Sequence, residues 1–185
     1  MNLLHLDSSV TGDESVTRKL SANIVDRFVA NGDVRVTYRD LAAKPLGHFT
    51  LADFADSTVV DEFLATDIVV IGAPMYNFSI PSQLKAWIDR IYIKDKTFRY
   101  GATGPEGLCI SKRVVVGIAR GGVYGEDSGN ISAEHCESYL KYVFGFLGIK
   151  DIEFVLAEGV AMGPDAKAAS IKSADEATAG LEVTA

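Results

Sequence analysis

The stretch Asp67-Ile68-Val69-Val70-Ile71-Gly72-Ala73-Pro74-Met75-Tyr76-Asn77-Phe78 joins an apolar run to a loop with aromatic and polar side chains. A run that is apolar on both sides is typical of a central strand in a parallel sheet, and such sheets bind ligands outside the carboxyl ends of their strands. Tyr76 and Phe78 can lie along a planar ring, and Asn77 offers a hydrogen-bond donor and an acceptor. The stretch therefore indicates a ligand loop, although an ordinary turn with two packed aromatic residues explains it equally well when it is taken alone.

Five short apolar runs alternate with stretches compatible with helices, which is typical of a parallel α/β sheet. The runs are Leu3–Leu6, Val34–Tyr38, Ile68–Ala73, Val114–Ala119 and Ile152–Ala157. The second run alternates polar and apolar residues and predicts an edge strand, whereas the third and fourth predict central strands. If the first crossover goes one way and the later ones the other, the strand order is 2-1-3-4-5. The chain thus predicts a three-layer α/β fold with a five-stranded parallel sheet.

Apolar residues at helical spacing mark the stretches between these runs. They form three stripes, which are Leu20, Ile24, Val25 and Phe28; Leu84, Trp87, Ile88 and Ile91; and Tyr139, Val143, Phe146 and Leu147. A last helix with a frayed end is expected after Pro164. No linker, repeat or low-complexity tract divides the chain, so we expect a single domain over residues 1–185.

Composition limits the possible partners. The chain has 25 acidic and 18 basic residues, a formal net charge of -7, and no run of lysine or arginine that could follow a phosphate backbone. Nucleic-acid binding is therefore not expected. The N-terminus lacks a basic region, and no apolar stretch approaches the roughly 18 residues of a membrane helix. We expect a cytoplasmic protein without membrane contact.

The potential metal-binding and redox side chains are scattered. Cys109 and Cys136 are far apart in the sequence and are predicted to be reduced, structural thiols. His5, His48 and His135 are also widely separated, and none has a second ligand at metal-binding spacing. No metal site is expected.

The first strand ends in Asp7-Ser8-Ser9 and leads through a short loop into a helix. Hydroxyl groups of Ser9, Ser15 and Thr17, with the free amides around Val16 at the helix N-terminus, can surround a phosphate monoester. The loop lacks the glycine-lysine pattern of nucleoside-triphosphate sites and the three-glycine turn of dinucleotide sites, which favours a mononucleotide. In isolation, simple helix capping by Ser15 explains the loop better.

The fourth strand ends in Ala119-Arg120-Gly121-Gly122-Val123-Tyr124-Gly125, which places a glycine turn at the same sheet edge. Paired glycines let a backbone approach a flat ring and direct amides at its carbonyl oxygens. A merely flexible turn is about as plausible, and Arg120 fits a salt bridge beneath the loop as well as a contact to a cofactor or a second subunit. Together, the three loops favour a flavin mononucleotide (FMN) site.

These motifs resemble the FMN-dependent NADH-azoreductases, which are flavodoxin-like quinone and azo-compound reductases. The resemblance runs along nearly the whole chain. It is carried by Ser8-Ser9, Arg39-Asp40-Leu41-Ala42-Ala43, Ala73 to Phe78, Gln83-Leu84-Lys85, Thr97-Phe98-Arg99-Tyr100, Gly104-Pro105-Glu106-Gly107-Leu108, Arg120-Gly121-Gly122, Gly145-Phe146-Leu147-Gly148 and Ala157-Glu158-Gly159.

The resemblance implies a flavodoxin-like fold, one FMN per subunit and a homodimer with a flavin site at each end of its interface. The implied FMN contacts are Ser9, Ser15, Val16, Thr17, Met75, Tyr76, Asn77, Phe78, Ala119, Arg120, Gly121 and Gly122. Tyr100 and the partner-derived Phe146 would line the substrate cleft, and Tyr124 near the glycine turn is a candidate proton donor there.

The implied activity is a two-electron reduction of quinones and the reductive cleavage of aromatic azo compounds, with hydride passing from NADH, or from NADPH, through bound FMN in a ping-pong scheme. The flavin carries the chemistry, so no catalytic side chain is assigned. A flavodoxin-like one-electron carrier without small-molecule turnover is the alternative, and a ligand-free interaction module is a third. Two departures from the family pattern leave the flavin affinity and the substrate preference open: Ala119 replaces a frequent hydroxyl residue, and the segment 44–58 is short.

Overall fold

A parallel sheet of five strands forms the middle layer of the computed structural model, which describes residues 1–183. Its strands are β1 (Asn2–Asp7), β2 (Arg35–Asp40), β3 (Ile68–Pro74), β6 (Arg113–Arg120) and β7 (Asp151–Glu158), in the order β2-β1-β3-β6-β7. The five predicted strands are all present, each within two residues of its predicted ends. The predicted frayed end after the last helix lies in part outside the described residues.

The five sheet strands lie in the predicted spatial order 2-1-3-4-5, but this numbering becomes 2-1-3-6-7 when every strand in the chain is counted. β4 (Phe98–Gly101) and β5 (Gly104–Gly107) form an antiparallel hairpin outside the sheet, between β3 and β6 in the chain. The fourth and fifth strands of the sheet are therefore β6 and β7. Sequence analysis missed the hairpin because its strands are four residues long and exposed for the most part, so they bury no apolar run.

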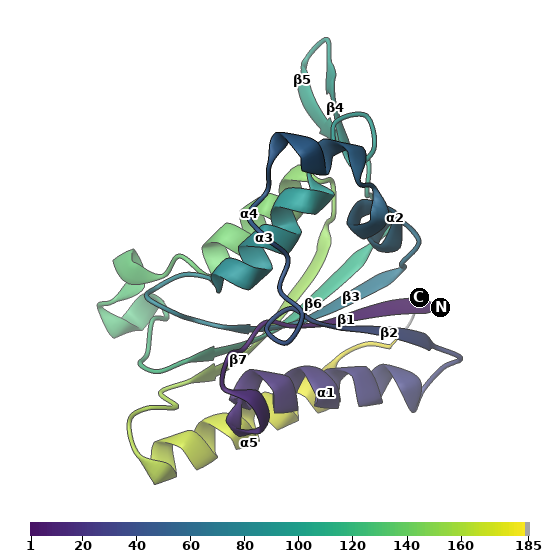
Figure 1. The fold of residues 1–185 in the computed structure, drawn as a ribbon. Coiled ribbons are helices and arrows are strands. Elements are labelled where there is room, and N and C mark those ends of the chain that lie inside the picture. Colours follow the sequence, from purple (N-terminus) through teal and green to yellow (C-terminus); the bar gives the residue numbers. More distant parts are fainter. Residues whose placement is uncertain (184–185) are drawn as a thin grey trace.

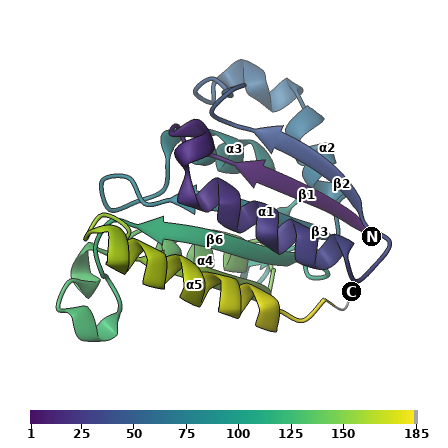
Figure 2. The ribbon, with the colours of Figure 1, turned by 90° about the horizontal axis from the view of Figure 1, so that it is seen from below.

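Helices cover both faces of the sheet. α1 (Val16–Val29) and α5 (Pro164–Gly180) lie on one face, and α2 (Thr58–Leu64), α3 (Ser82–Ile91) and α4 (Glu137–Phe146) lie on the other (Figures 1 and 2). Short 3₁₀ helices occur at Gly12–Glu14, Leu51–Ala55, Glu126–Ser128 and Ile131–Ala133. The three-layer arrangement matches the prediction. No helix within residues 1–183 has the length and apolar character needed to cross a membrane.

The predicted apolar stripes bury against the sheet, with one shift. Every member of the α1 and α3 stripes is buried. On α4 the buried face instead contains Leu140, Val143 and Phe144, while Tyr139 and Phe146 are only half-buried. Strands β3 and β6 are buried along their whole lengths, as predicted for central strands, and β2 lies at the edge of the sheet with most of its residues exposed.

Gly72 in β3 allows α1 to lie very close to the sheet. A Cβ atom at this position would come within 2.7 Å of Asp7 Oδ1 and 3.0 Å of the Thr17 carbonyl oxygen. Any larger residue would therefore push the start of α1 away from the strand ends. The sequence thus fixes the first turn of α1 beside the carboxyl ends of β1 and β3.

The hairpin is anchored to the end of α4 by a close contact between two glycines. Gly148 has a φ of 89°, and a Cβ atom on Gly107 would lie 2.2 Å from the backbone of residues 147 and 148. Phe98 at the base of the hairpin contacts the ring of Phe146 at 5.3 Å, and Phe146 stacks on Tyr92 at 5.7 Å. The hairpin therefore projects beyond the three layers, and its base packs against the end of α4 (Figure 1).

Both cysteines are free and buried, in agreement with structural thiols. Burial raises the pKa of the Cys136 thiol to about 12. His5 is also buried, and its Nε2 lies 2.9 Å from Ser21 Oγ in the core beneath the first loop. Within residues 1–183, no group of three or more His, Cys, Asp or Glu side chains is arranged to hold a metal ion.

Candidate functional site

A cavity of about 300 Å³ lies at the carboxyl ends of β1, β3 and β6. It is lined by Ser9, Thr11, Glu14, Ser15, Val16, Thr17, Pro74, Met75, Tyr76, Ala119, Gly121, Val160 and Lys167. All three loops predicted from the sequence contribute to it. Its size is at the lower end of the range of roughly 300–1,000 Å³ that is usual for small-molecule sites.

The loop between β1 and α1 forms the hydroxyl-rich wall. Ser15 Oγ accepts a hydrogen bond from the Arg18 amide at 3.2 Å and lies 3.0 Å from Thr17 Oγ1. The capping role of Ser15 is therefore confirmed, and the same hydroxyl lies at the cavity wall. Because the first turn of a helix leaves amides without intrahelical partners, this wall is suited to an anion.

Arg18 fixes this loop from behind. Its guanidinium donates to both carboxylate oxygens of Asp40, at 2.7 and 2.9 Å, and to the Ser9 carbonyl oxygen at 2.9 Å. The Asp40 carboxylate also accepts from the amides of Ala42 and Ala43. The hydrogen bonds from Arg18, helped by the two amides, lower the pKa of Asp40. A charged pair thus connects the end of β2 to the first ligand loop.

Tyr76 joins the first loop to the second. Its hydroxyl lies 3.2 Å from Ser9 Oγ and accepts from the Val10 amide at 3.2 Å. The next two residues, Asn77 and Phe78, have φ values of 48° and 73°, a region that side-chain-bearing residues seldom adopt. Such backbone is kept where the surroundings impose it, and it clusters at ligand sites. Asn77 and Phe78 are exposed and lie just beyond the cavity wall.

The glycine turn forms the opposite wall. The carbonyl oxygens of residues 120, 121 and 122 accept hydrogen bonds from the amides of Val160, Ala161 and Gly159, at 2.9 to 3.1 Å. The Ala119 carbonyl oxygen accepts from the Met75 amide at 2.9 Å, which ties this turn to the second loop. Ala119 and Gly121 line the cavity, whereas Arg120 and Gly122 lie behind it.

The side chain of Arg120 points away from the cavity, toward α4. It is 1% exposed and pairs with Glu158 at 3.0 Å, Glu137 at 2.6 Å and Glu134 at 3.3 Å. Glu134 in turn accepts from three backbone amides at the start of α4. Of the two interpretations of Arg120, the salt bridge beneath the loop is confirmed within the subunit.

The three predicted cleft aromatics are separated. The Tyr124 ring contacts Phe78 edge-on at 6.3 Å and lies beside the cavity. Tyr100, which is 66% exposed, and Phe146 both contact Phe98 at the hairpin base, and neither lines the cavity. One subunit therefore does not bring Tyr100 and Phe146 to the cavity loops, and the role of all three aromatics in a shared cleft stays a prediction.

The lining residues that were not predicted as contacts are Thr11, Glu14, Pro74, Val160 and Lys167. Thr11 and Glu14 lie within the first loop and could have been included on position alone. Val160 and Lys167 follow β7 and open α5, which the sequence pattern did not connect to the site. Lys167 is the one cationic side chain among the lining residues of this cavity.

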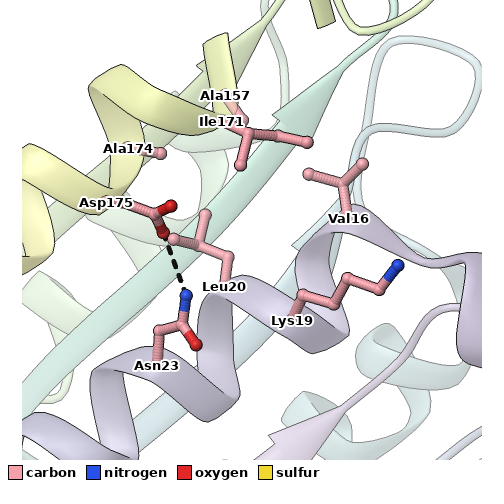
Figure 3. Close-up of a pocket in the computed structure, with 8 residues that line it drawn as sticks. All are labelled: Val16, Lys19, Leu20, Asn23, Ala157, Ile171, Ala174 and Asp175. Carbon is pink, nitrogen blue, oxygen red and sulfur yellow. Dashed lines mark hydrogen bonds between the residues drawn. The ribbon is translucent and has the colours of Figure 1, made fainter. Parts of the chain in front are cut away.

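Among the cavities elsewhere in the fold, two differ from this one in position or size. One of about 500 Å³ opens at the amino ends of the strands, beside Asp67, Lys112 and Arg113. A small apolar cavity of about 40 Å³ lies between α1 and α5, lined by Leu20 of α1, Ala157 of β7, and Ile171 and Ala174 of α5 (Figure 3). The first is at the wrong sheet edge for a flavodoxin-type ligand, and the second is too small for one.

Comparisons with known proteins agree with the fold. Residues 1–180 match a family described as having a flavodoxin-like fold. The chain is 50% identical to "FMN-dependent NADH:quinone oxidoreductase 2" of Bradyrhizobium diazoefficiens, over 98% of this chain and 99% of that protein. It is 49% identical to an FMN-dependent NADH:quinone oxidoreductase of Acidovorax ebreus, over 96% of this chain and 91% of that one.

Among solved structures, an FMN-dependent NADH-azoreductase from Bacillus anthracis in complex with FMN superimposes with a TM-score of 0.83, at 26% identity over 97% of this chain and 99% of that one. This chain belongs to the flavodoxin-like family. The resemblance to FMN-dependent NADH-azoreductases drawn from the sequence motifs is confirmed.

Proposed function

We propose that this protein is an FMN-dependent NADH:quinone oxidoreductase that also cleaves aromatic azo compounds. The observation that carries the proposal is the cavity at the carboxyl edge of the sheet, where a hydroxyl-rich helix start faces a glycine turn in a chain about half identical to reductases of that name. FMN, when bound, supplies the two-electron chemistry, taking hydride from NADH and delivering it to the second substrate.

The donor set of the cavity fits the two ends of FMN. Ser9, Ser15 and Thr17, with the amides at the start of α1, would hold the phosphate. Tyr76 would close this end, because its hydroxyl is already hydrogen-bonded to the same loop. These groups suit a phosphate because it needs hydrogen-bond donors, and because the helix dipole favours negative charge at the helix N-terminus.

The ring would lie between the second loop and the glycine turn. Met75 and Tyr76 would form one side, and the backbone of Ala119 and Gly121 the other. Asn77 and Phe78 would reach the ring from the strained turn. The amides of the glycine turn would favour negative charge on the carbonyl edge, and the protein would orient the substrates and exclude water.

Quinones and aromatic azo compounds are the proposed substrates, and a homodimer is the proposed assembly. The hairpin of β4 and β5 projects from the layers (Figure 1), and Tyr100 and Phe146 both contact Phe98 at its base without lining the cavity of their own subunit, which supports a cleft completed by a second copy. Tyr124 beside Phe78 would face that cleft.

The test is an absorbance spectrum of the purified protein with added FMN, followed by NADH oxidation with and without a simple quinone. We expect the flavin absorbance to bleach with NADH and to recover when quinone is added. Flavin that binds but stays oxidised with NADH would favour the electron-carrier alternative. Asn77→Ala should lower turnover while the protein keeps its fold, because Asn77 is exposed.

A further inference from the structure

Buried Arg120 and its carboxylate partners Glu134, Glu137 and Glu158 form a charged cluster directly behind the glycine turn. Arg120 ends β6, between Ala119 and Gly121, which both line the cavity. Successive strand residues point to opposite sides, so the backbone passes the cavity while the guanidinium points to α4. Arg120 therefore stands between two lining residues without lining the cavity itself.

This cluster connects the start of the glycine turn to its end through Glu158. Arg120 donates to Glu158 Oε1 at 3.0 Å, and the same oxygen accepts from the Tyr124 amide at 2.9 Å. One carboxylate oxygen of Glu158 thus links the Arg120 side chain to the backbone of Tyr124. Directly after Glu158, residues 159 to 161 hold the three carbonyl groups of residues 120 to 122.

The charge balance makes Arg120 necessary for this arrangement. Three carboxylates surround one guanidinium, and Glu134 is itself buried. Without the arginine, Glu158 and Glu134 would repel one another with no cation between them. A lysine has one ammonium group and cannot span carboxylates on separate sides as the planar guanidinium does.

We infer that Arg120 is a positioning residue, which with Glu158 fixes the glycine turn in the orientation that holds the flavin ring. The inference rests on the proposed function only in taking the ligand to be a flavin. It concerns binding of the ring, and not hydride transfer, so the two can fail separately.

The test compares Arg120→Lys with Arg113→Lys as a matched control. Arg113 begins the same strand, is buried at 8% exposure against 1% for Arg120, and pairs with Asp151 and Glu153 at the amino end of the sheet. We measure the dissociation constants of FMN and of riboflavin, the spectrum of the bound flavin, and the thermal unfolding of each variant. Hydrogen exchange over residues 120–125 is followed in the flavin-free protein.

We expect Arg120→Lys to weaken FMN and riboflavin alike by about tenfold, a loss of about 1.4 kcal/mol. It should also shift the bound-flavin spectrum and speed exchange over residues 120–125. Arg113→Lys should change the flavin dissociation constants less than about twofold, whatever its effect on stability. Glu158→Ala provides a second variant if Arg120→Lys folds poorly, and it should also weaken both flavins and speed the same exchange.

Unchanged flavin binding and exchange in folded Arg120→Lys or Glu158→Ala would overturn the inference. So would equal weakening by the Arg113 variant, because that result indicates a loss of general stability. Wild-type protein that binds flavin but does not oxidise NADH would overturn the proposed function and leave the inference standing. Wild-type protein that binds neither flavin would overturn both.

Discussion

Lys167 gives the cavity a positive charge that the sequence motifs did not include. It projects from the first turns of α5 and lines the same cavity as Ser15 and Thr17. A phosphate monoester carries close to two negative charges at neutral pH, so a nearby ammonium group should favour it. The hydroxyl groups of the first loop cannot supply that charge.

We predict that Lys167→Gln weakens FMN binding about three- to tenfold and leaves riboflavin binding unchanged, because riboflavin lacks the phosphate. The matched control is Lys172→Gln on the same helix, whose side chain is 80% exposed and paired with Glu176. Titration of both flavins at two salt concentrations checks the prediction, since the Lys167 contribution should shrink as salt screens it. Equal weakening of the two flavins would place Lys167 away from the phosphate.

The positions of lining residues were predictable where residue type and loop position pointed the same way, as at Ser15 and Tyr76. The contribution of a residue was not predictable where the direction of its side chain decides whether it reaches the cavity. The sequence puts Arg120 in a ligand loop, and only the alternation along β6 shows that its guanidinium turns away. Lys167 lies about 150 residues from Ser15, and no local pattern connects them.

At the scale of elements, the pair formed by Arg18 and Asp40 connects α1 to the end of β2. Each side chain is about one-fifth exposed, and two hydrogen bonds join them. The folded pKa of Asp40 lies below its unfolded value, so the folded protein gains stability above about pH 4. That stability is lost as the pH falls through the folded pKa.

We predict that Asp40→Asn lowers the free energy of unfolding by about 1–2 kcal/mol at pH 7, and that its difference from wild type shrinks below pH 4. Asparagine retains an acceptor for the amides of Ala42 and Ala43, so the change isolates the charge. Urea unfolding between pH 3 and 7 provides the measurement. As the control, Glu176→Gln breaks an exposed pair on α5 and should change the free energy of unfolding much less. A difference between Asp40→Asn and wild type that does not vary with pH would contradict the charge argument.

The apolar cavity between α1 and α5 is a second feature at this scale (Figure 3). We predict that Ala157→Val raises the free energy of unfolding by about 1 kcal/mol, because valine suits a strand and fills a void of about 40 Å³. Leu20→Ala should enlarge the void and cost about 2–5 kcal/mol. Thermal and urea unfolding of the two variants check these opposite signs, and a destabilised Ala157→Val would mean that the space is already filled.

For the molecule as a whole, the sequence predicted the layers and the five sheet strands from their apolar runs. It did not predict the hairpin, because a short exposed hairpin is stabilised by its anchor and not by its own buried face. That anchor is the contact of Gly107 with the backbone of Gly148, residues about 40 apart in the chain. Contacts of this kind leave no periodic pattern.

We predict that the protein is a dimer of its 19.9 kDa chain, and that Tyr100→Ala lowers quinone turnover about tenfold with little change in FMN affinity. The reason is that the hairpin, which projects from the layers, would deliver Tyr100 to the cleft of a second copy. Light scattering gives the mass, and steady-state kinetics gives the turnover. The control is Val29→Ser, a change of an exposed residue at the far end of α1. A monomeric protein with full activity would contradict the prediction.

The walls of the cavity come from four stretches that lie far apart in the chain, at 9–17, 74–76, 119–121 and 160–167. An unfolded chain therefore has no partial version of the site, and flavin can bind the native state alone. By mass action, flavin at a hundred times its dissociation constant would add about 2.7 kcal/mol to the stability of the fold. The supply of the vitamin would then set how long each molecule survives proteolysis, so that a cell short of riboflavin would lose the enzyme as well as its cofactor.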